Sequence, residues 1–129
     1  MTQEAYCSFE VAKLLKKKGF LKNVDLRMTQ NLSFYDNIGL SHNLNKWYDS
    51  LIQDKIDFVV APTHQMARRW LRETHGIDII IDISNPSVKD RKYYCMIWDG
   101  NNNSYILDLF DSYEEAVEAA LMYCLENLI

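Results

Sequence analysis

Two aspartates in the second half of the chain could hold a metal ion, and a lysine lies beside one of them. Asp82 precedes Asp90 and Lys92, which gives the order Asp…Asp-x-Lys. Some metal-dependent nucleases use this arrangement, because carboxylate oxygens are hard ligands that suit Mg²⁺. The pattern is short and often occurs by chance, and Asp90 and Lys92 lie beside a turn, where charge is expected anyway. We therefore predict no catalytic residue, and we predict that the protein is not an enzyme.

Basic side chains form a second candidate site. The candidate nucleic-acid or partner surface consists of Lys13, Lys16, Lys17, Arg68, Arg69 and Arg72. Contacts from lysine and arginine to phosphates supply most non-specific affinity for nucleic acids. The same residues are typical of the solvated face of an amphipathic helix, and cations in a last helical turn favour the negative end of the helix dipole. The pattern favours the solvated face and leaves the binding surface as the alternative.

Histidines and cysteines show no metal-ligand spacing. The histidines are His42, His64 and His75, and no two of them are four residues apart. The cysteines are Cys7, Cys95 and Cys124, and no two of them form a Cys-x-x-Cys pair. We predict no metal and no cofactor, and we expect the cysteines to be small apolar residues in a reducing compartment. His64 could sense pH near the start of a helix, but the sequence offers no partner for it.

The stretch 63–129 predicts helix, strand, strand, strand, helix. Thr63 can cap a helix over 63–75 that ends at Gly76, and Ser112 with Glu115 forms a capping box for a helix over 112–127. Between them we predict a strand over 77–83, a turn over 84–87, and a hairpin of 91–100 with 103–110. One side of the first helix is expected to be buried, with Trp70 in the core: Met66, Ala67, Trp70, Leu71 and Thr74. Because a strand follows Gly76, a helix-turn-helix is excluded there.

The stretch 1–62 gives weaker patterns. Ser8 is a good N-cap for a helix over 8–18, and Gly19 suits the left-handed residue after it. Residues 22–28 could be a strand, and 35–43 looks like a loop. Helical spacing recurs over 43–52, and 56–62 is a short apolar run that Pro62 stops.

Composition indicates a globular α+β domain over 1–129, with 21–60 giving the least clear pattern. Hydrophobic residues make up 48% of the chain and charged residues 25%, close to the averages for folded domains. The net charge of −4 argues mildly against a dedicated nucleic-acid binder. No signal peptide and no membrane span are visible, so we expect a cytoplasmic protein.

Three stretches together resemble a known group of proteins: "CSFEVAKLLKKKGF" at 7–20, "APTHQMARRWLRETHGI" at 61–77 and "SYEEAVEAALMYCLENLI" at 112–129. The group consists of uncharacterised small proteins carried by phages, prophages and mobile elements of gut Bacteroidetes and other bacteria. The resemblance covers about half of the chain and implies a phage or prophage origin. It supplies no activity and no catalytic residues.

The sequence thus predicts an α+β fold in which a small antiparallel sheet of at least three strands packs against amphipathic helices. The expected function is a non-catalytic accessory or interaction protein of phage or prophage origin, whose partner is another protein. The alternative is a nucleic-acid-binding regulator that uses the lysine and arginine surface. A free sheet edge would also allow a homo-oligomer.

Overall fold

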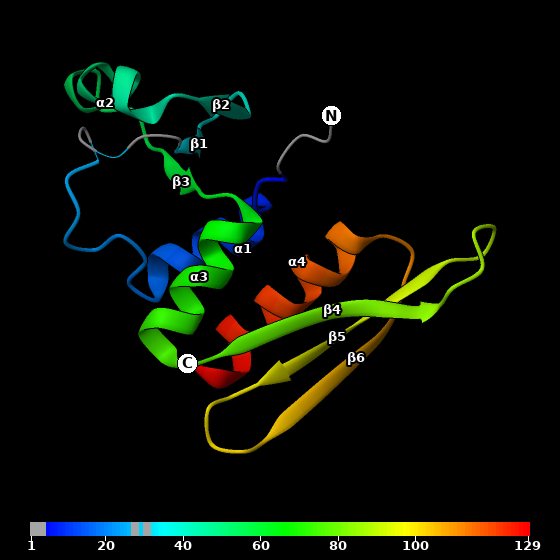
Figure 1. The fold of residues 1–129 in the computed structure, drawn as a ribbon. Coiled ribbons are helices and arrows are strands. Elements are labelled where there is room, and N and C mark those ends of the chain that lie inside the picture. Colours follow the sequence, from blue (N-terminus) through cyan, green and yellow to red (C-terminus); the bar gives the residue numbers. More distant parts are fainter. Residues whose placement is uncertain (1–4, 27–28, 30–31) are drawn as a thin grey trace. The chain divides into compact units, whose positions relative to one another are not determined.

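The computed structural model describes residues 5–26, 29 and 32–129 (Figure 1). Its helices and its two antiparallel three-stranded sheets confirm the predicted α+β class. The chain divides into two compact units, Met1–Thr63 and His64–Ile129, which are described separately below. The expectation of one domain over 1–129 stays a prediction.

The first unit begins with the predicted helix, α1 (Phe9–Lys17). The Ser8 hydroxyl accepts a hydrogen bond from the Val11 N–H at 3.2 Å, which confirms the cap. After the helix, the Phe20 N–H donates to the Leu15 carbonyl and the Gly19 N–H to the Lys16 carbonyl. This Schellman pattern requires a left-handed residue, and Gly19 has φ +95°. The buried face packs against β3 and consists of Val11, Ala12 and Leu15.

Two expectations for the first unit were wrong. Residues 22–26 form turns and no strand, while 27–28 lie outside the described residues. The stretch 35–43 is not a plain loop, because it holds the end of β1 (Ser33–Tyr35) and all of β2 (Leu40–His42). The Asp36 carboxylate accepts the N–H groups of Ile38 and Gly39 at 2.8 and 3.2 Å, which closes a tight turn between these strands.

The remaining elements of the first unit follow the apolar spacing. Helix α2 (Leu44–Gln53) confirms the helical pattern and buries Leu44 and Leu51. Strand β3 (Val59–Ala61) pairs antiparallel with β1, so the sheet has the order β2-β1-β3. The start of the chain joins β3's end through an isolated antiparallel bridge between Tyr6 and Thr63.

The second unit begins with α3 (His64–His75), in agreement with the predicted helix. Its buried residues are His64, Ala67 and Leu71. Thr74 is exposed, and Trp70 is half-buried with its ring edge against His75 at 4.9 Å between centroids. The expectation of a fully buried Trp70 and Thr74 was therefore wrong.

Three antiparallel strands follow in the order β4-β5-β6. They are β4 (Asp78–Asn85), β5 (Lys92–Trp98) and β6 (Ser104–Phe110). Alternation holds along β4, because Ile79 is buried while Asp78 and Ile80 are exposed. The strand runs through 84–85, so the predicted turn over 84–87 begins later than expected. Gly100 in the hairpin turn lies so close to Gly76 that a Cβ there would be 2.9 Å from the Gly76 carbonyl oxygen.

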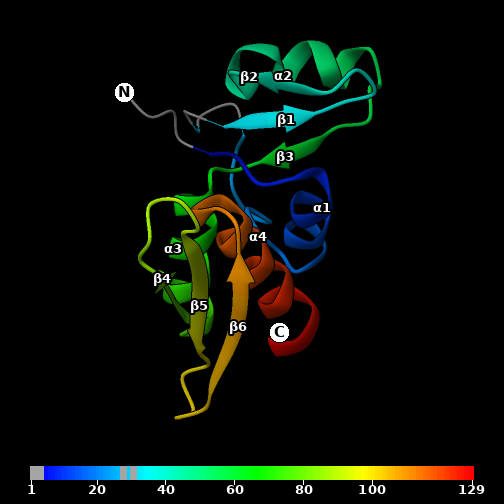
Figure 2. The same cartoon turned by 90° about the vertical axis from the view of Figure 1, so that its right-hand side faces the viewer.

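The last helix covers one side of this sheet. Helix α4 (Tyr113–Tyr123) continues into a π-helical turn, η1 (Cys124–Leu128). The Ser112 hydroxyl accepts the Glu115 N–H at 3.1 Å, which confirms the predicted cap. Helices α3 and α4 lie on the same side of β4, β5 and β6 (Figures 1 and 2). The buried residues of the last helical segment are Ala116, Val117, Ala120, Leu121, Cys124 and Leu125.

Truncating the core should cost far more than truncating the surface of the same unit. Leu121 is fully buried on α4, and Leu109 is 65% exposed on β6. We expect Leu121→Ala to lower the free energy of unfolding by about 2–5 kcal/mol, because a cavity is left behind. Leu109→Ala should change it by less than about 0.5 kcal/mol. Urea unfolding followed by circular dichroism measures both, and equal losses would contradict this placement of α4.

The β5–β6 turn should be sensitive to acid. The Asp99 carboxylate accepts hydrogen bonds from the N–H groups of Asn101 and Asn103 and from the Asn103 side chain, and these lower the pKa of Asp99. A carboxyl whose pKa is lower in the folded state stabilises the fold above its unfolded pKa of about 4. This stabilisation is lost as the pH falls through the folded pKa. A carbon-detected NMR titration of Asp99 should give a midpoint below the ordinary range, and Asp99→Asn should abolish this part of the acid response.

Candidate functional site

The residues of the predicted basic surface are divided between the two units. Lys13 forms an ion pair with Glu10 at 3.5 Å and lies 4.7 Å above the centre of the Phe9 ring. Lys16 and Lys17 are exposed in the last turn of α1. These three lysines belong to the first unit and the three arginines to the second, so each group is considered within its own unit.

The three arginines of α3 have different surroundings. Arg68 Nη2 donates to the Ile79 carbonyl oxygen at 2.6 Å, and Nη1 donates to the Tyr113 hydroxyl at 3.0 Å. Because Ile79 belongs to the edge strand β4, Arg68 ties α3 to the sheet and to the start of α4. Arg69 pairs with Glu73 at 3.0 Å, one turn further along the same helix. Arg72 is exposed, and it enters no ion pair with the described residues. Arg68 therefore has a structural role that helix periodicity did not reveal.

Lysines in the last turn of α1 and directly after it line a cleft. Its volume is about 960 Å³. Four lysines line it together with one acid, Asp57, and its apolar part comes from the two segments that follow α1 and α2. Lys16 and Lys17 from the predicted surface line this cleft, whereas Lys13 does not. Sequence analysis missed the cleft, since its lining comes from two segments, 16–26 and 52–60, that are distant along the chain.

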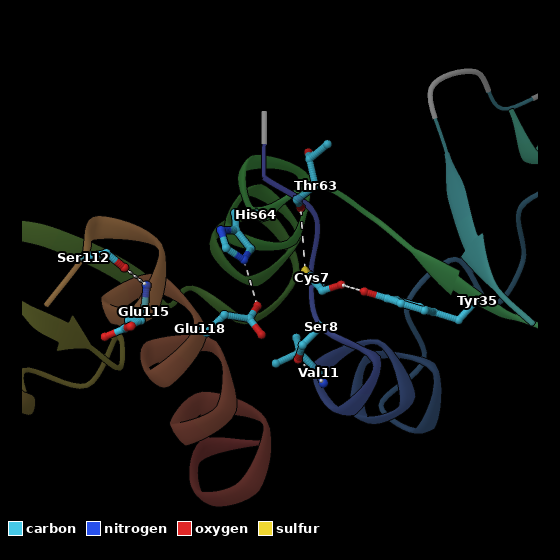
Figure 3. A network of polar contacts seen from close by, with 9 residues as sticks. All are labelled: Cys7, Ser8, Val11, Tyr35, Thr63, His64, Ser112, Glu115 and Glu118. Carbon is cyan, nitrogen blue, oxygen red and sulfur yellow. Dashed lines mark hydrogen bonds and ion pairs between the residues drawn. The ribbon is translucent and has the colours of Figure 1, made fainter. Parts of the chain in front are cut away.

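His64 has a hydrogen-bond partner that the sequence analysis did not find. In the second unit, His64 Nε2 lies 2.8 Å from Glu118 Oε2 (Figure 3). The His64 side chain is 10% exposed and that of Glu118 27%, so the pair joins the first turn of α3 to the middle of α4 at a partly buried place. A hydrogen bond between groups 54 residues apart cannot be foreseen from local spacing. The pair can hold two helices together.

Polar contacts in the first unit hold the segment before α1 in place. The Cys7 N–H donates to the Pro62 carbonyl at 2.9 Å, and the Tyr35 hydroxyl donates to the Cys7 carbonyl at 2.7 Å (Figure 3). The Cys7 thiol lies 3.9 Å from the Thr63 carbonyl oxygen. This backbone segment is thus fixed by both β1 and the end of β3.

The nuclease-like pattern has few features of an active site. Asp82 is exposed on β4, and its carboxylate accepts the neighbouring Ile83 N–H at 2.7 Å. Lys92 forms an ion pair with Asp111, and the hydrogen bond that the Lys92 ammonium donates to this carboxylate raises the pKa of Lys92. Within the described ranges, neither Asp82 nor Asp90 belongs to a group of three converging metal ligands.

The thiols of the second unit are buried. Burial raises the pKa of Cys95, and it raises the pKa of Cys124 to about 12. Both are therefore protonated at neutral pH, which is the unreactive form of a cysteine. Their place in the core agrees with the expectation that they behave as small apolar residues.

The second unit exposes an apolar face that the sequence pattern did not single out. We call the side of the sheet turned away from α4 the outer sheet face. Its apolar and aromatic residues are Ile80, Tyr94, Met96, Trp98 and Ile106, and its polar residues include Asp78, Asp82 and Ser104. Ile80 pairs with Met96, and Met96 with Ile106, so one apolar row crosses all three strands. Ile80 is 48% exposed and Ile106 60%. Most faces of this kind carry polar side chains when water covers them.

Comparisons with known proteins add no relative. No protein-family model, no curated protein and no solved structure matches this chain. A further finding concerns membranes: among the helices in the described part of the chain, none has the length and apolar character needed to span one.

Arg68 and Arg72 should behave differently when truncated. Arg68→Ala removes two hydrogen bonds from a charged donor, so we expect a loss of about 1–3 kcal/mol in the free energy of unfolding. Arg72→Ala removes an exposed side chain and should change it by less than about 0.5 kcal/mol. Urea titrations of the two variants measure this difference. Equal stability of both variants would show that the bonds from Arg68 to Ile79 and Tyr113 contribute nothing.

Proposed function

We propose that this protein is a non-catalytic accessory or interaction protein of phage or prophage origin, which binds another protein through its outer sheet face. The phage origin rests on the resemblance of 7–20, 61–77 and 112–129 to proteins of mobile elements. The binding role rests on one observation, the apolar row Ile80–Met96–Ile106 across the second sheet, of which Ile80 and Ile106 are exposed. Contiguous apolar surface on a small protein usually marks an interaction site.

The charges beside this row favour a basic partner. Asp78 and Asp82 alternate with Ile80 along β4, so all three side chains lie on the outer sheet face. Asp78 pairs in register with Trp98, and Asp82 with Tyr94. An arginine or lysine of a partner could thus meet a carboxylate and an aromatic ring together. The partner that fits best presents basic and apolar side chains side by side.

The same charges disfavour two other occupants. A second copy joined through β4 would bring Asp78 and Asp82 against their own counterparts, and like charges across strands are destabilising. A nucleic acid would place phosphates against these carboxylates. A protein partner is therefore favoured over both at this face.

One observation supports the alternative function, a nucleic-acid-binding regulator. Lys16 and Lys17 lie together at a cleft with further lysines, where they could meet phosphates. Such binding should weaken steeply as salt is raised. A filter-binding series at increasing salt with single-stranded and double-stranded oligonucleotides tests it.

A variant of the outer sheet face should lose its partner. We expect Ile80→Ser combined with Ile106→Ser to abolish co-purification of a protein that the tagged wild type retains from its bacterial host. The matched control is Ile38→Ser with Val88→Ser, because these residues are 97% and 88% exposed but lie outside the outer sheet face. The control should retain the partner. Mass spectrometry and a gel of each eluate provide the measurement.

A separate pair of substitutions tests whether binding requires the two aspartates. Asp78→Asn with Asp82→Asn should weaken the purified partner's binding about tenfold, and raised salt should weaken it in the wild type. Retention of the partner by the Ile80 and Ile106 variant would reject the proposed face. A partner that is acidic, or binding that is unaffected by the two asparagines, would reject the proposed partner chemistry.

A further inference from the structure

The lysine-lined cleft of the first unit has the size of a small-molecule site. Its volume of about 960 Å³ falls within the range of about 300–1,000 Å³ that ligand pockets occupy. All its lining residues lie between Lys16 and Val60, so it belongs to the first unit alone. It shares no residue with the outer sheet face.

Positive charge exceeds negative charge among the described residues that line the cleft. Four of them are lysines, which we call its rim: Lys16, Lys17, Lys18 and Lys22. One described lining residue, Asp57, is an acid. Lys16, Lys17 and Lys22 form no ion pair with any described acidic side chain. On a chain whose net charge is −4, this is a local field that attracts anions.

Apolar side chains also line the cleft. We call five of them its floor: Phe20, Ile52, Ile56, Phe58 and Val60. Ile52 is 53% exposed and Ile56 39%, so part of this floor faces water. Two helix ends create it: Phe20 and Ile56 each follow a left-handed residue, and their N–H groups donate back to the carbonyls of Leu15 and Leu51. An apolar group in the cleft would remove this exposed surface from water.

Backbone strain marks the same place. Leu21 lines the cleft with φ +58°, and Lys55, directly before Ile56, has φ +55°. The left-handed region costs a residue with a side chain about 1–2 kcal/mol. Strain of this kind gathers at ligand sites, where the surrounding structure holds it.

From these features we infer that the cleft binds a free amphiphilic anion, a small molecule that joins a phosphate or carboxylate head to an apolar body. The lysines receive the head, and the floor from Phe20 to Val60 receives the body. A nucleic-acid polymer fits less well, because its charge repeats along its length while the lysines gather on one wall. A flat membrane surface fits less well too, since the floor is concave.

Octyl phosphate is the probe, titrated into the isotope-labelled full chain below its micelle concentration. Amide NMR shifts should saturate and should map to Gly19, Phe20 and Ile56. Inorganic phosphate (the head alone) and 1-octanol (the body alone) should each bind at least about tenfold more weakly, because neither fills both parts of the site. Equal binding of 1-octanol and octyl phosphate would overturn the inference, as would shifts confined to β4–β6.

Matched lysine variants test the role of the rim. Lys16→Gln with Lys17→Gln should weaken octyl phosphate binding about tenfold. Lys13→Gln with Lys46→Gln makes the same change in net charge outside the cleft and should alter binding by less than about twofold. All four side chains lie at the surface of α1 or α2, and amide spectra check that both variants are folded. If both variants lost the same amount of octyl phosphate affinity, the loss would reflect net charge alone, and the proposed site would be rejected.

Two further probes separate other ligands from the inferred one. An oligothymidylate that displaces octyl phosphate and binds more tightly would replace the inference with the nucleic-acid alternative. Vesicles containing phosphatidic acid that retain the wild type, when free octyl phosphate does not bind, would also overturn it. Neither result bears on the outer sheet face, whose test uses different variants.

Discussion

One-sided burial of the sheet β4–β5–β6 governs the second unit. Side chains alternate along a strand, so when α4 covers Ile79, Cys95 and Ile97, the residues between them must face outward. The last helix supplies small residues, Ala116 and Ala120, that let it approach the strands closely. The apolar row on the opposite face follows from this packing, because each strand also places an apolar residue there: Ile80, Met96 and Ile106.

The basic residues illustrate how equal residue types take unequal roles. Arg68 bonds to a strand carbonyl and a tyrosine, Arg69 pairs with Glu73, and Arg72 faces water. Charge runs along a helix therefore do not predict which cation serves the fold. Among the lysines, position relative to the end of α1 decides the outcome, since only those in and after its last turn reach the cleft.

The two candidate surfaces have opposite electrostatic character. The outer sheet face places Asp78 and Asp82 beside apolar and aromatic side chains, whereas the cleft places lysines beside an apolar floor. A ligand suited to one is repelled by the other. The two proposed ligands, a basic protein and a small anion, are therefore assigned to different units.

The sequence by itself determined the elements whose signals are local. Ser8 and Ser112 fixed two helix starts, Gly19 and Gly76 two helix ends, and the isoleucines at every second residue over 77–83 predicted β4. These signals depend on hydrogen bonds and periodicity within a few residues. For that reason the order helix, strand, strand, strand, helix was predicted correctly.

Tertiary structure decided the rest, because the deciding partners are far apart in sequence. Strands of three residues, such as β1 and β2, are too short to show alternation and are defined only by their pairing. The His64–Glu118 bond, the bonds of Arg68 and the two walls of the cleft all join distant segments. Which apolar face α4 would cover, and which would stay exposed, likewise depended on packing that no local pattern records.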